Sequence, residues 1–583
     1  MTYPKIPLAQ SVIQLCKAKH IKHIIISPGS RNAPLTIGFS NDSYFTCYSI
    51  VDERCAAFFA MGIAQKSKEP TAVVCTSGSA LLNYYPAVAE AFYSDIPLVV
   101  LTADRPKHLI GIGDGQTINQ KNVFENHILY SANLKLDLDE NQKEAEELPI
   151  FKSLENKLET LLGLKKSIQD FNAEEINKAI NISVINNGPV HINIPFDEPL
   201  YETVEVLAVH PTVIAPENIP LEIEEQVIDD CIEAWSSAKR KLVLIGVNEP
   251  NTISEAYLDV FSNDDSVMVF TETTSNLSND AFFPSIDKII APLTDADFEK
   301  LQPEIVLTFG GLIVSKKIKA FLRTRKPKHH WHVDLKKAND TFFSLNRFIK
   351  TSPNYFLSKL LPASKIVESD YKSYWNTVKA YRNERHQAYL NSVEYSDLKA
   401  FSYVLKAIPD NTALQLGNSS TVRYVQLFNL NKTLEVYCNR GTSGIDGSTS
   451  TAIGFAVASD KPTTLITGDI SFFYDSNALW NNYIPKNFRI ILINNSGGGI
   501  FRILPGDKNT EAFSTFFETK HVLTAQHLCN MYGFKYEHVS DELSLESALE
   551  EFYNEDNSPK LLEIFTPRTL NDELLINYFK FLK

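Results

Sequence analysis

The sequence lacks the features of membrane and secreted proteins. It has no apolar run near the ~20 residues that a membrane helix needs, and Met1-Thr2-Tyr3-Pro4-Lys5 does not begin the long apolar core of a signal peptide. Its seven cysteines form no CxxC pair, and this odd count is typical of a reducing compartment. We therefore expect a cytoplasmic protein without an integral membrane segment.

An excess of positive charge is also missing. The chain has 56 Lys and Arg against 70 Asp and Glu, a formal net charge of −14. This balance argues against non-specific nucleic-acid binding, although an acidic chain can contain a locally basic pocket. The 583 residues, 44% of them hydrophobic, indicate a large globular enzyme of roughly three or four domains.

Apolar strand candidates alternate with helical patterns, such as residues 79–93, in three parts of the chain. The expected strands are 23–27, 45–51, 71–75, 97–102, 190–195, 241–247, 266–271, 304–309, 330–334, 412–416, 434–438, 463–467, 489–494 and 560–565. Alternating strands and helices favour mainly parallel sheets covered on both faces. The sequence thus predicts an α/β fold of three doubly wound domains, over residues 1–200, 225–360 and 396–583. Their similar size suggests an ancient duplication.

Three segments outside these strands have a composition of their own. Residues 136–160 are acidic and are expected to form a solvated helix or insertion. Residues 201–225, acidic and containing proline, are predicted to be a linker. Residues 361–395, polar and rich in tyrosine, are predicted to form a helical connector.

The most informative motif is Gly468-Asp469-Ile470, followed 26 positions after the aspartate by Asn495 within Asn494-Asn495-Ser496-Gly497. Each part follows an apolar strand candidate, and ligands bind at the carboxyl ends of parallel strands. Carboxylate and carboxamide oxygens suit a hard cation such as Mg²⁺, which can hold a phosphate. A turn of small polar residues is the alternative interpretation.

Glu53 lies between a strand candidate and an amphipathic helix expected over residues 55–64. An acid in a first helical turn often only complements the helix dipole. Thiamine diphosphate (ThDP) chemistry, however, needs a carboxylic group bonded to N1′ of the aminopyrimidine. An acid in the first block and a metal–diphosphate motif in the third would hold both ends of that cofactor.

Several further motifs together resemble one ThDP-dependent family. They are Ser27-Pro28-Gly29-Ser30-Arg31-Asn32-Ala33-Pro34-Leu35, Val51-Asp52-Glu53-Arg54, Thr102-Ala103-Asp104-Arg105-Pro106, Gln116-Thr117-Ile118, Gly417-Asn418-Ser419 with Arg423, and Asn439-Arg440-Gly441-Thr442-Ser443-Gly444-Ile445-Asp446-Gly447. The chain resembles the 2-succinyl-5-enolpyruvyl-6-hydroxy-3-cyclohexene-1-carboxylate (SEPHCHC) synthases of menaquinone biosynthesis. The match covers the first and third blocks; the middle block adds Gly310-Gly311 and Lys316. Gly115 and Ser496 depart from the family pattern.

The resemblance implies decarboxylation of 2-oxoglutarate on ThDP and addition of the resulting succinyl carbanion equivalent to isochorismate. It implies that Asp469, Asn495 and the Gly497 carbonyl hold Mg²⁺ or Mn²⁺, and that Ile445 supports the bent cofactor. Without the resemblance, Ile445 would be an ordinary core residue. The remaining implied cofactor contacts are Glu53, Ser77, Gly78, Ser419, Gly444, Gly468, Ile470, Ile500 and Phe501.

Both implied substrates are dicarboxylates, which arginine can bind through its planar fork. The implied substrate-binding residues are Ser30, Arg31, Arg105, Gln116, Lys316, Ser419, Arg423 and Arg440. Glu53, Gln116 and Arg440 are the implied catalytic residues. Any one arginine taken alone is more often a surface or helix-terminal residue.

In the wider superfamily, the cofactor lies between two subunits. The resemblance therefore implies a homodimer or homotetramer in which Glu53 and Asp469 meet across an interface. Two alternatives stay open. One is another ThDP-dependent 2-oxoacid decarboxylase or carboligase, of the acetolactate synthase type, and the arginine set argues against it. The other is a cofactor-free scaffold, against which Glu53, Asp469 and Asn495 argue.

Overall fold

The computed structural model describes residues 2–136, 167–217, 222–503 and 506–583. The described chain forms two compact units. The first unit comprises Met1–Asn218, Thr449–Asp460 and Asp475–Pro485, and the second comprises Ile219–Ser448, Lys461–Tyr474 and Lys486–Lys583. The acidic insertion predicted at 136–160 lies almost wholly outside the described residues.

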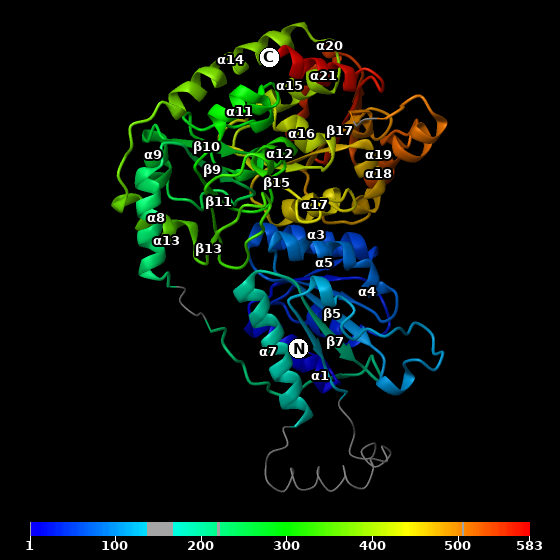
Figure 1. The fold of residues 1–583 in the computed structure, drawn as a ribbon. Coiled ribbons are helices and arrows are strands. Elements are labelled where there is room, and N and C mark those ends of the chain that lie inside the picture. The colour runs from blue at the N-terminus through cyan, green and yellow to red at the C-terminus, as the bar shows by residue number, and fades with distance from the viewer. Residues whose placement is uncertain (1, 137–166, 218–221, 504–505) are drawn as a thin grey trace. The chain divides into compact units, whose positions relative to one another are not determined.

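The first unit contains a six-stranded parallel sheet. Its strand order is β3 (Thr46–Ser49), β2 (His23–Ile26), β4 (Thr71–Cys75), β5 (Leu98–Asp104), β7 (Val190–Pro195) and β6 (Tyr130–Asn133). The helices are α1 (Pro7–Ala18), α2 (Ala33–Asn41), α3 (Glu53–Ser67), α4 (Ala80–Asn83), α5 (Tyr85–Ser94) and α7 (Ile168–Asn186). Figure 1 shows the strands between α3 with α5 on one side and α1 with α7 on the other. A short antiparallel pair joins β1 (Tyr3–Pro4), near the start of the sequence, to β8 (Thr203–Val204), which lies in the predicted linker.

Burial on both faces explains the nearly continuous apolar strands of this sheet. Alternate residues such as Ile24 and Val74 join a core cluster with α1, α2 and α7. Ile25 and Val73 point the other way and are equally buried. The expected helix at 79–93 proved to be two helices, because Pro86 at the start of α5 cannot supply a backbone N–H.

Helix α3, which begins at Glu53, is fixed by a close approach to α17 (Ser448–Ala458). A Cβ on Gly62 of α3 would lie 2.1 Å from the Thr451 carbonyl oxygen, and one on Gly454 would lie 2.0 Å from that of Phe59. Only glycine allows these backbones to come so near. The position of Glu53 therefore rests on a rigid pair of helices.

The second unit contains two further parallel sheets. The central sheet has the order β10 (Val267–Thr271), β9 (Lys241–Ile245), β11 (Ile305–Phe309), β12 (His329–Val333) and β13 (Arg347–Ile349). Its helices are α8 (Glu225–Ser237), α9 (Glu255–Asn263), α10 (Ile286–Ile290), α11 (Asp295–Leu301), α12 (Lys316–Thr324) and α13 (Pro353–Ala363). Val243 and Leu244 point into two different core clusters, so this sheet too is buried on both faces.

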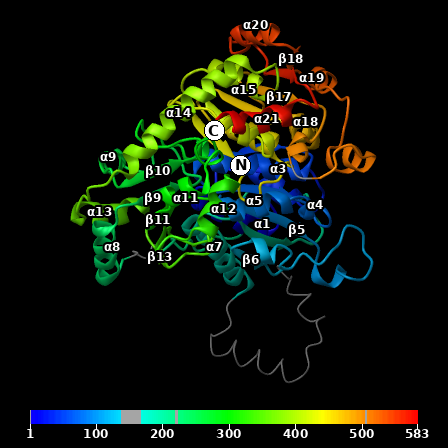
Figure 2. The ribbon, with the colours of Figure 1, turned by 45° about the horizontal axis from the view of Figure 1, so that its top comes forward.

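The C-terminal sheet has the order β15 (Glu435–Cys438), β14 (Ala413–Leu416), β16 (Thr463–Gly468), β17 (Arg489–Asn494), β19 (Lys560–Phe565) and β18 (Lys535–Val539). Its helices are α15 (Asp397–Ala407), α16 (Ser420–Val425), α18 (Asp469–Tyr474), α19 (Gln526–Tyr532), α20 (Glu542–Phe552) and α21 (Asn571–Phe581). The predicted connector is the helix α14 (Tyr371–Ser392), which contacts α15 and α21 (Figure 2). The predicted α/β class with parallel sheets is confirmed.

The first and the C-terminal sheets share one strand order. Numbered along the chain within each sheet, both read 2-1-3-4-6-5, and the central sheet reads 2-1-3-4-5. Each of the three sheets lies inside one of the three ranges predicted from the sequence, although the domain boundaries themselves stay a prediction. None of the helices in the described parts of the chain combines the length and apolar character of a membrane span.

Candidate active site

The two sheets with the shared order place the predicted site residues at their carboxyl edges. In each sheet the chain turns to opposite sides after the first and third strands, and ligands bind in the crevice that this reversal creates. In the first unit these residues are Ser30 and Arg31 after β2, Glu53 after β3, Ser77 and Gly78 after β4, and Arg105 and Gln116 after β5. In the second unit they are Ser419 and Arg423 after β14, Arg440, Gly444 and Ile445 after β15, Gly468, Asp469 and Ile470 at the end of β16, and Asn495, Gly497, Ile500 and Phe501 after β17. Lys316 begins α12, after β11 of the central sheet.

Glu53 is the first residue of α3 and is half-buried. Asp52 caps the helix by accepting a hydrogen bond from the Cys55 N–H at 3.2 Å. The Asn83 amide donates to Glu53 Oε2 at 3.3 Å. Burial raises the pKa of the Cys75 thiol at the end of β4, and the Glu53 carboxylate adds to that rise. The carboxylate therefore lies beside the crevice next to β4.

The turn after β4 brings Ser77, Gly78 and Gln116 together. Ser77 is buried, and its hydroxyl has no hydrogen-bond partner among the described residues. Gly78 has a φ of +91°, and a Cβ there would lie 3.0 Å from the Gln116 carbonyl oxygen. Gln120 fixes this turn, because its side chain accepts from the Gly78 N–H at 2.9 Å and donates to Asn193 Oδ1 at 2.8 Å. Sequence reasoning missed Gln120, which stands in an unremarkable polar loop.

Arg31 and Arg105 bring two positive charges to the loops of the first unit. Arg31 is 7% exposed and donates to the Phe196 carbonyl at 3.2 Å. Burial lowers its pKa, and the charge of Arg105 lowers it further. Arg105 donates to the carbonyl of Gly115 at 2.9 Å, which is one of the two positions that depart from the family pattern. This contact uses the backbone, so it does not depend on the side chain at position 115.

Asp469, Asn495 and Gly497 lie together at the ends of β16 and β17. Asp469 is 3% exposed, and its carboxylate accepts from the Ile470 N–H at 2.7 Å and the Gly497 N–H at 2.9 Å. Asn495 Oδ1 is buried and has no hydrogen-bond partner in the described chain. The Gly497 carbonyl accepts one hydrogen bond, from the Gly499 N–H at 3.0 Å.

These oxygens suit a hard divalent cation. The unsatisfied Asn495 oxygen is costly in a protein interior unless a ligand completes it. A carboxylate, an amide oxygen and a backbone carbonyl are ligands that Mg²⁺ accepts, with water or phosphate in the remaining positions. No group of three or more His, Cys, Asp and Glu side chains is placed to hold a metal within the described ranges, so a cation here would rely on the amide and carbonyl oxygens.

Asp397, at the start of α15, orients Asn495. The Asn495 amide donates to Asp397 Oδ2 at 2.9 Å, and the Thr566 hydroxyl donates to Oδ1 at 2.5 Å. Burial raises the pKa of Asp397 to about 6, against the effect of these hydrogen bonds. Because the amide N–H is fixed on Asp397, the oxygen of Asn495 must point the other way. Asp397 is 98 positions from Asn495 in the chain, and no sequence signal linked the two.

A third residue that the sequence did not reveal is His521. Its Nε2 lies 3.2 Å from Asp469 Oδ2, and its backbone N–H donates to the Ser496 carbonyl at 3.3 Å. The ring packs edge-on against Phe473 at 5.5 Å. His521 thus closes one side of the Asp469 carboxylate.

Asn418 organises the loop that carries Arg440, Gly444 and Ile445. Its amide donates to the carbonyls of Asn439 and Gly444, each at 2.7 Å, and its oxygen accepts from Arg440 Nη1 at 2.7 Å. The Ile445 carbonyl in turn accepts from the Ser471 hydroxyl of α18 at 3.1 Å. These bonds tie the predicted cofactor support to the helix that begins with Asp469.

Four cations gather on the second unit near this loop. Burial lowers the pKa of Arg423, and the charge of Arg440 lowers it further. Burial also lowers the pKa of Lys319, which Arg440 and Lys316 lower as well. Arg423 donates to the Ser419 carbonyl, and Ser419 has a φ of +67°. Lys319, one helical turn after Lys316, was not predicted; the positive cluster it joins can bind anionic groups.

Ile500 and Phe501 lie on a 3₁₀ helix (Gly499–Ile503) after β17. Ile500 is half-buried, and Phe501 is 36% exposed. The Phe501 ring packs edge-on against Phe517 at 6.2 Å. Both apolar residues therefore follow the strand that ends before Asn495 and are not part of the core.

Glu272 holds the start of α12, where Lys316 lies. Its buried carboxylate accepts from the backbone N–H groups of Val314 and Ser315, both at 2.7 Å. Burial nevertheless raises its pKa to about 7. Since this pKa is above the unfolded value, the folded protein binds more protons between about pH 4.5 and 7. Stability from this group is therefore greatest at low pH and falls as the pH rises.

We expect Glu272→Gln to remove this dependence. From pH 5 to pH 7 the wild type should lose about 2 kcal/mol of stability that the variant does not lose. Scanning calorimetry of both proteins at the two pH values measures the difference, because other groups titrate alike in both. Parallel changes in the two midpoints would show that Glu272 does not titrate in this range.

Two family models and several full-length relatives match the chain. Residues 6–128 match the thiamine pyrophosphate enzyme N-terminal TPP binding domain, and residues 417–564 match the C-terminal TPP binding domain. A protein of Christiangramia forsetii named 2-succinyl-5-enolpyruvyl-6-hydroxy-3-cyclohexene-1-carboxylate synthase is 55% identical over the full length of both chains. Proteins of the same name from Flavobacterium johnsoniae and Porphyromonas gingivalis are 54% and 36% identical, covering 100% and 98% of this chain and 100% and 96% of their own.

Proposed function

Because the chain belongs to the SEPHCHC synthases, ThDP-dependent enzymes of menaquinone biosynthesis, we propose how its own residues divide that work. The reaction joins the four-carbon unit left by decarboxylation of 2-oxoglutarate to isochorismate. When bound, ThDP supplies the electron sink, and the protein supplies position and electrostatics. The unsatisfied Asn495 oxygen beside Asp469 is the observation that carries this assignment.

The activity is tested by incubation with 2-oxoglutarate, isochorismate, ThDP and Mg²⁺. We expect isochorismate to disappear and carbon dioxide to be released, and no change when 2-oxoglutarate is omitted. Consumption of pyruvate in place of 2-oxoglutarate would favour the acetolactate synthase type instead. Absence of ThDP binding in calorimetry would favour a scaffold.

Asp469, Asn495 and the Gly497 carbonyl would hold Mg²⁺ or Mn²⁺. Asp397 would act as a positioning residue through the Asn495 amide. Glu53 would hold a proton at N1′ of the cofactor's pyrimidine ring, and Ser77 and Gly78 would line that side. Ile445 would support the cofactor, and Gly444, Gly468, Ile470, Ser419, Ile500 and Phe501 would contribute to its binding.

The two cationic clusters would bind carboxylates. Arg423, Arg440 and Lys316 from the second unit, with Arg31 and Arg105 from the first, would fix the dicarboxylate substrates. Ser30, Ser419 and Gln116 would add hydrogen bonds. The four arginines already lie among hydrogen-bonding partners, and this limits the rotamer freedom that binding would have to remove.

Arg440→Ala is expected to raise the KM for 2-oxoglutarate about 10–100-fold, because a charge-assisted carboxylate contact is lost. The affinity for ThDP should change far less. Arg323→Ala is the matched control. It removes an arginine of α12 that donates to the Thr341 carbonyl, and it should leave the KM for 2-oxoglutarate and the affinity for ThDP unchanged. Equal losses in substrate and cofactor affinity would show that Arg440 supports the loop as a whole.

We further propose a homodimer or homotetramer in the cytoplasm. In this assembly the first unit of one subunit would face the second unit of its partner, so that Glu53 and Asp469 grip opposite ends of one ThDP. Sedimentation of the cofactor-bound protein tests the assembly: a catalytically active monomer would contradict it.

A further inference from the structure

A cavity of about 340 Å³ in the second unit lies apart from the residues discussed so far. Its walls are α10, α14, α15 and the segment after α16. Two lysines, Lys288 and Lys406, line it, and among the described residues no Asp or Glu does. In a chain with a net charge of −14, a cavity with two cations and no acid is unusual.

Lys288 is the key side chain of this cavity. It is 2% exposed, and the described chain offers its ammonium neither a hydrogen-bond acceptor nor a carboxylate. Burying an ammonium without such partners is unfavourable. Burial lowers the pKa of Lys288 to about 8, so the group still carries a charge over much of the neutral range.

The other buried lysines make the contrast clear. Five further lysines are at most 9% exposed, and each has an acceptor: Lys19, Lys241, Lys372, Lys399 and Lys560. Lys372, for example, donates to three backbone carbonyls, the nearest at 2.7 Å. This protein therefore satisfies its buried ammonium groups as a rule, and Lys288 is the exception among the described residues.

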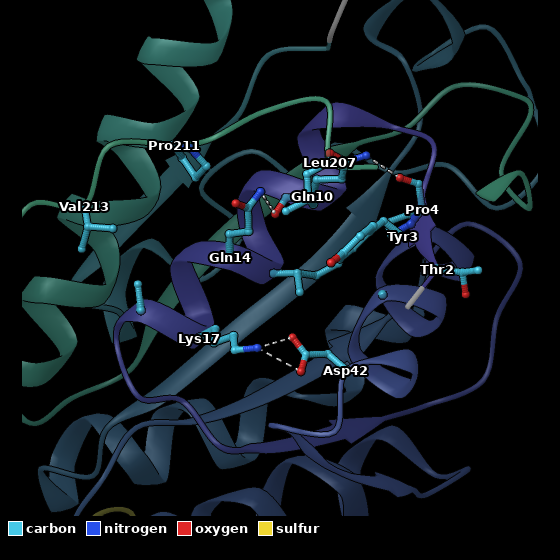
Figure 3. A pocket seen from close by; sticks show the side chains of 13 residues that line it. Thr2, Tyr3, Pro4, Gln10, Gln14, Lys17, Asp42, Leu207, Pro211 and Val213 are labelled. Carbon is cyan, nitrogen blue, oxygen red and sulfur yellow. Dashed lines mark hydrogen bonds and ion pairs between the residues drawn. The ribbon is translucent and has the colours of Figure 1, made fainter. Parts of the chain in front are cut away.

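A second cavity, of about 380 Å³ in the first unit, provides another comparison. Its lysine, Lys17, is bonded to both oxygens of Asp42, at 3.1 and 2.8 Å (Figure 3). The charge there is compensated within the protein. Among the described residues that line the cavity around Lys288 there is no such carboxylate.

The rest of the lining indicates the shape of a ligand. Leu390, Leu405, Ile408 and Phe428 give the cavity an apolar part. Three carboxamides, of Asn383, Gln387 and Asn429, can donate hydrogen bonds to an anion. A fourth, of Asn431, already donates to Asp410.

His386, also on the wall, adds no charge. Its Nδ1 is 2.7 Å from the Tyr578 hydroxyl. Burial, reinforced by Lys288, lowers its pKa to about 3, so the ring is neutral at neutral pH.

We propose that this cavity binds a small organic anion whose charged group meets Lys288 and whose apolar body lies against Leu390, Leu405, Ile408 and Phe428. The charged group is a carboxylate or a phosphate monoester, which share the acceptor oxygens that an ammonium needs. This inference does not rest on the proposed function, because none of the residues assigned to the reaction lines the cavity.

Dialysis of the full-length protein with hexanoate, hexyl phosphate and hexanol tests the proposal. We expect saturable binding of at least one of the two anions. Hexanol should bind at least about tenfold more weakly than that anion. The tighter of hexanoate and hexyl phosphate identifies the charged group. Absence of saturable binding for both anions would overturn the proposal.

Variants locate that binding. Lys288→Met should weaken it about tenfold or more, and Lys288→Arg should retain it. Lys359→Met, at an exposed lysine of α13 outside the cavity, is the matched control. Binding that is equally tight in Lys288→Met and in the wild type belongs to the arginine cluster and would also overturn the proposal.

Two further measurements distinguish a loss of binding from a failure of the variant to fold. Lys288→Met removes an unpaired buried charge, so its thermal-unfolding midpoint should rise. Leu405→Trp leaves Lys288 in place and fills the apolar part, and it should abolish hexanoate binding as well. Unchanged hexanoate binding in a folded Leu405→Trp protein would contradict the cavity as the site.

Discussion

Glu53→Gln is expected to lower turnover by about 10²–10⁴-fold and to leave the affinity for ThDP nearly unchanged. That range is what a positioned acid–base group typically contributes. The substitution keeps the size and the hydrogen-bonding reach of the side chain, and the Asn83 contact at 3.3 Å can persist. If Glu53 has the proposed role, the substitution would remove only the ability to exchange a proton with the pyrimidine ring.

Steady-state kinetics and calorimetric titration with ThDP together check this expectation. Glu69→Gln, at an exposed acid of the same unit, is the control and should behave as wild type. Near-normal turnover of Glu53→Gln would remove Glu53 from the mechanism. A loss of ThDP affinity as large as the loss of turnover would instead indicate a structural role at the start of α3.

Asp469→Ala is expected to abolish ThDP binding that depends on Mg²⁺. The variant removes the carboxylate that accepts from the Gly497 N–H and leaves the cation with neutral oxygens. Asp397→Ala should act more mildly, weakening metal affinity about 10–100-fold, because Asp397 would act on the metal only through the Asn495 amide. A chelator should likewise release ThDP from the wild type.

Calorimetry with ThDP at several Mg²⁺ concentrations separates these cases without measuring activity. Asp397→Ala should recover at high Mg²⁺, whereas Asp469→Ala should not. Asp507→Ala, at an exposed aspartate, is the control. If Asp469→Ala bound ThDP and Mg²⁺ normally, the metal would have to be held elsewhere.

All the central strands of the three parallel sheets were predictable from the sequence, and the edge strands only in part. Thr71–Cys75 and Arg489–Asn494 were predicted with the bounds that the structure has, because both of their faces are apolar. In these three sheets the missed strands β6, β13 and β18 are all at an edge, whereas the opposite edge strands β3, β10 and β15 were predicted. The missed strands are partly exposed and contain polar residues such as Asn133 and Lys535, so no apolar run marks them.

The site residues divide in a similar way. Asp469 and Asn495 follow apolar strands within a recognisable motif, and Glu53 follows another. Asp397, Gln120 and Asn418 act through hydrogen bonds to groups distant in the chain or within a loop. Their roles depend on tertiary contacts that a single sequence does not encode in any local pattern.

The repeated 2-1-3-4-6-5 order has an evolutionary consequence. Each end of the coenzyme is assigned to a copy of the same scaffold, and each copy has its own core beneath it. Mutations can therefore accumulate beneath one set of loops without disturbing the other. Such modularity would allow descendants of one ancestral gene to change the substrate while keeping the residues that bind the vitamin-derived coenzyme.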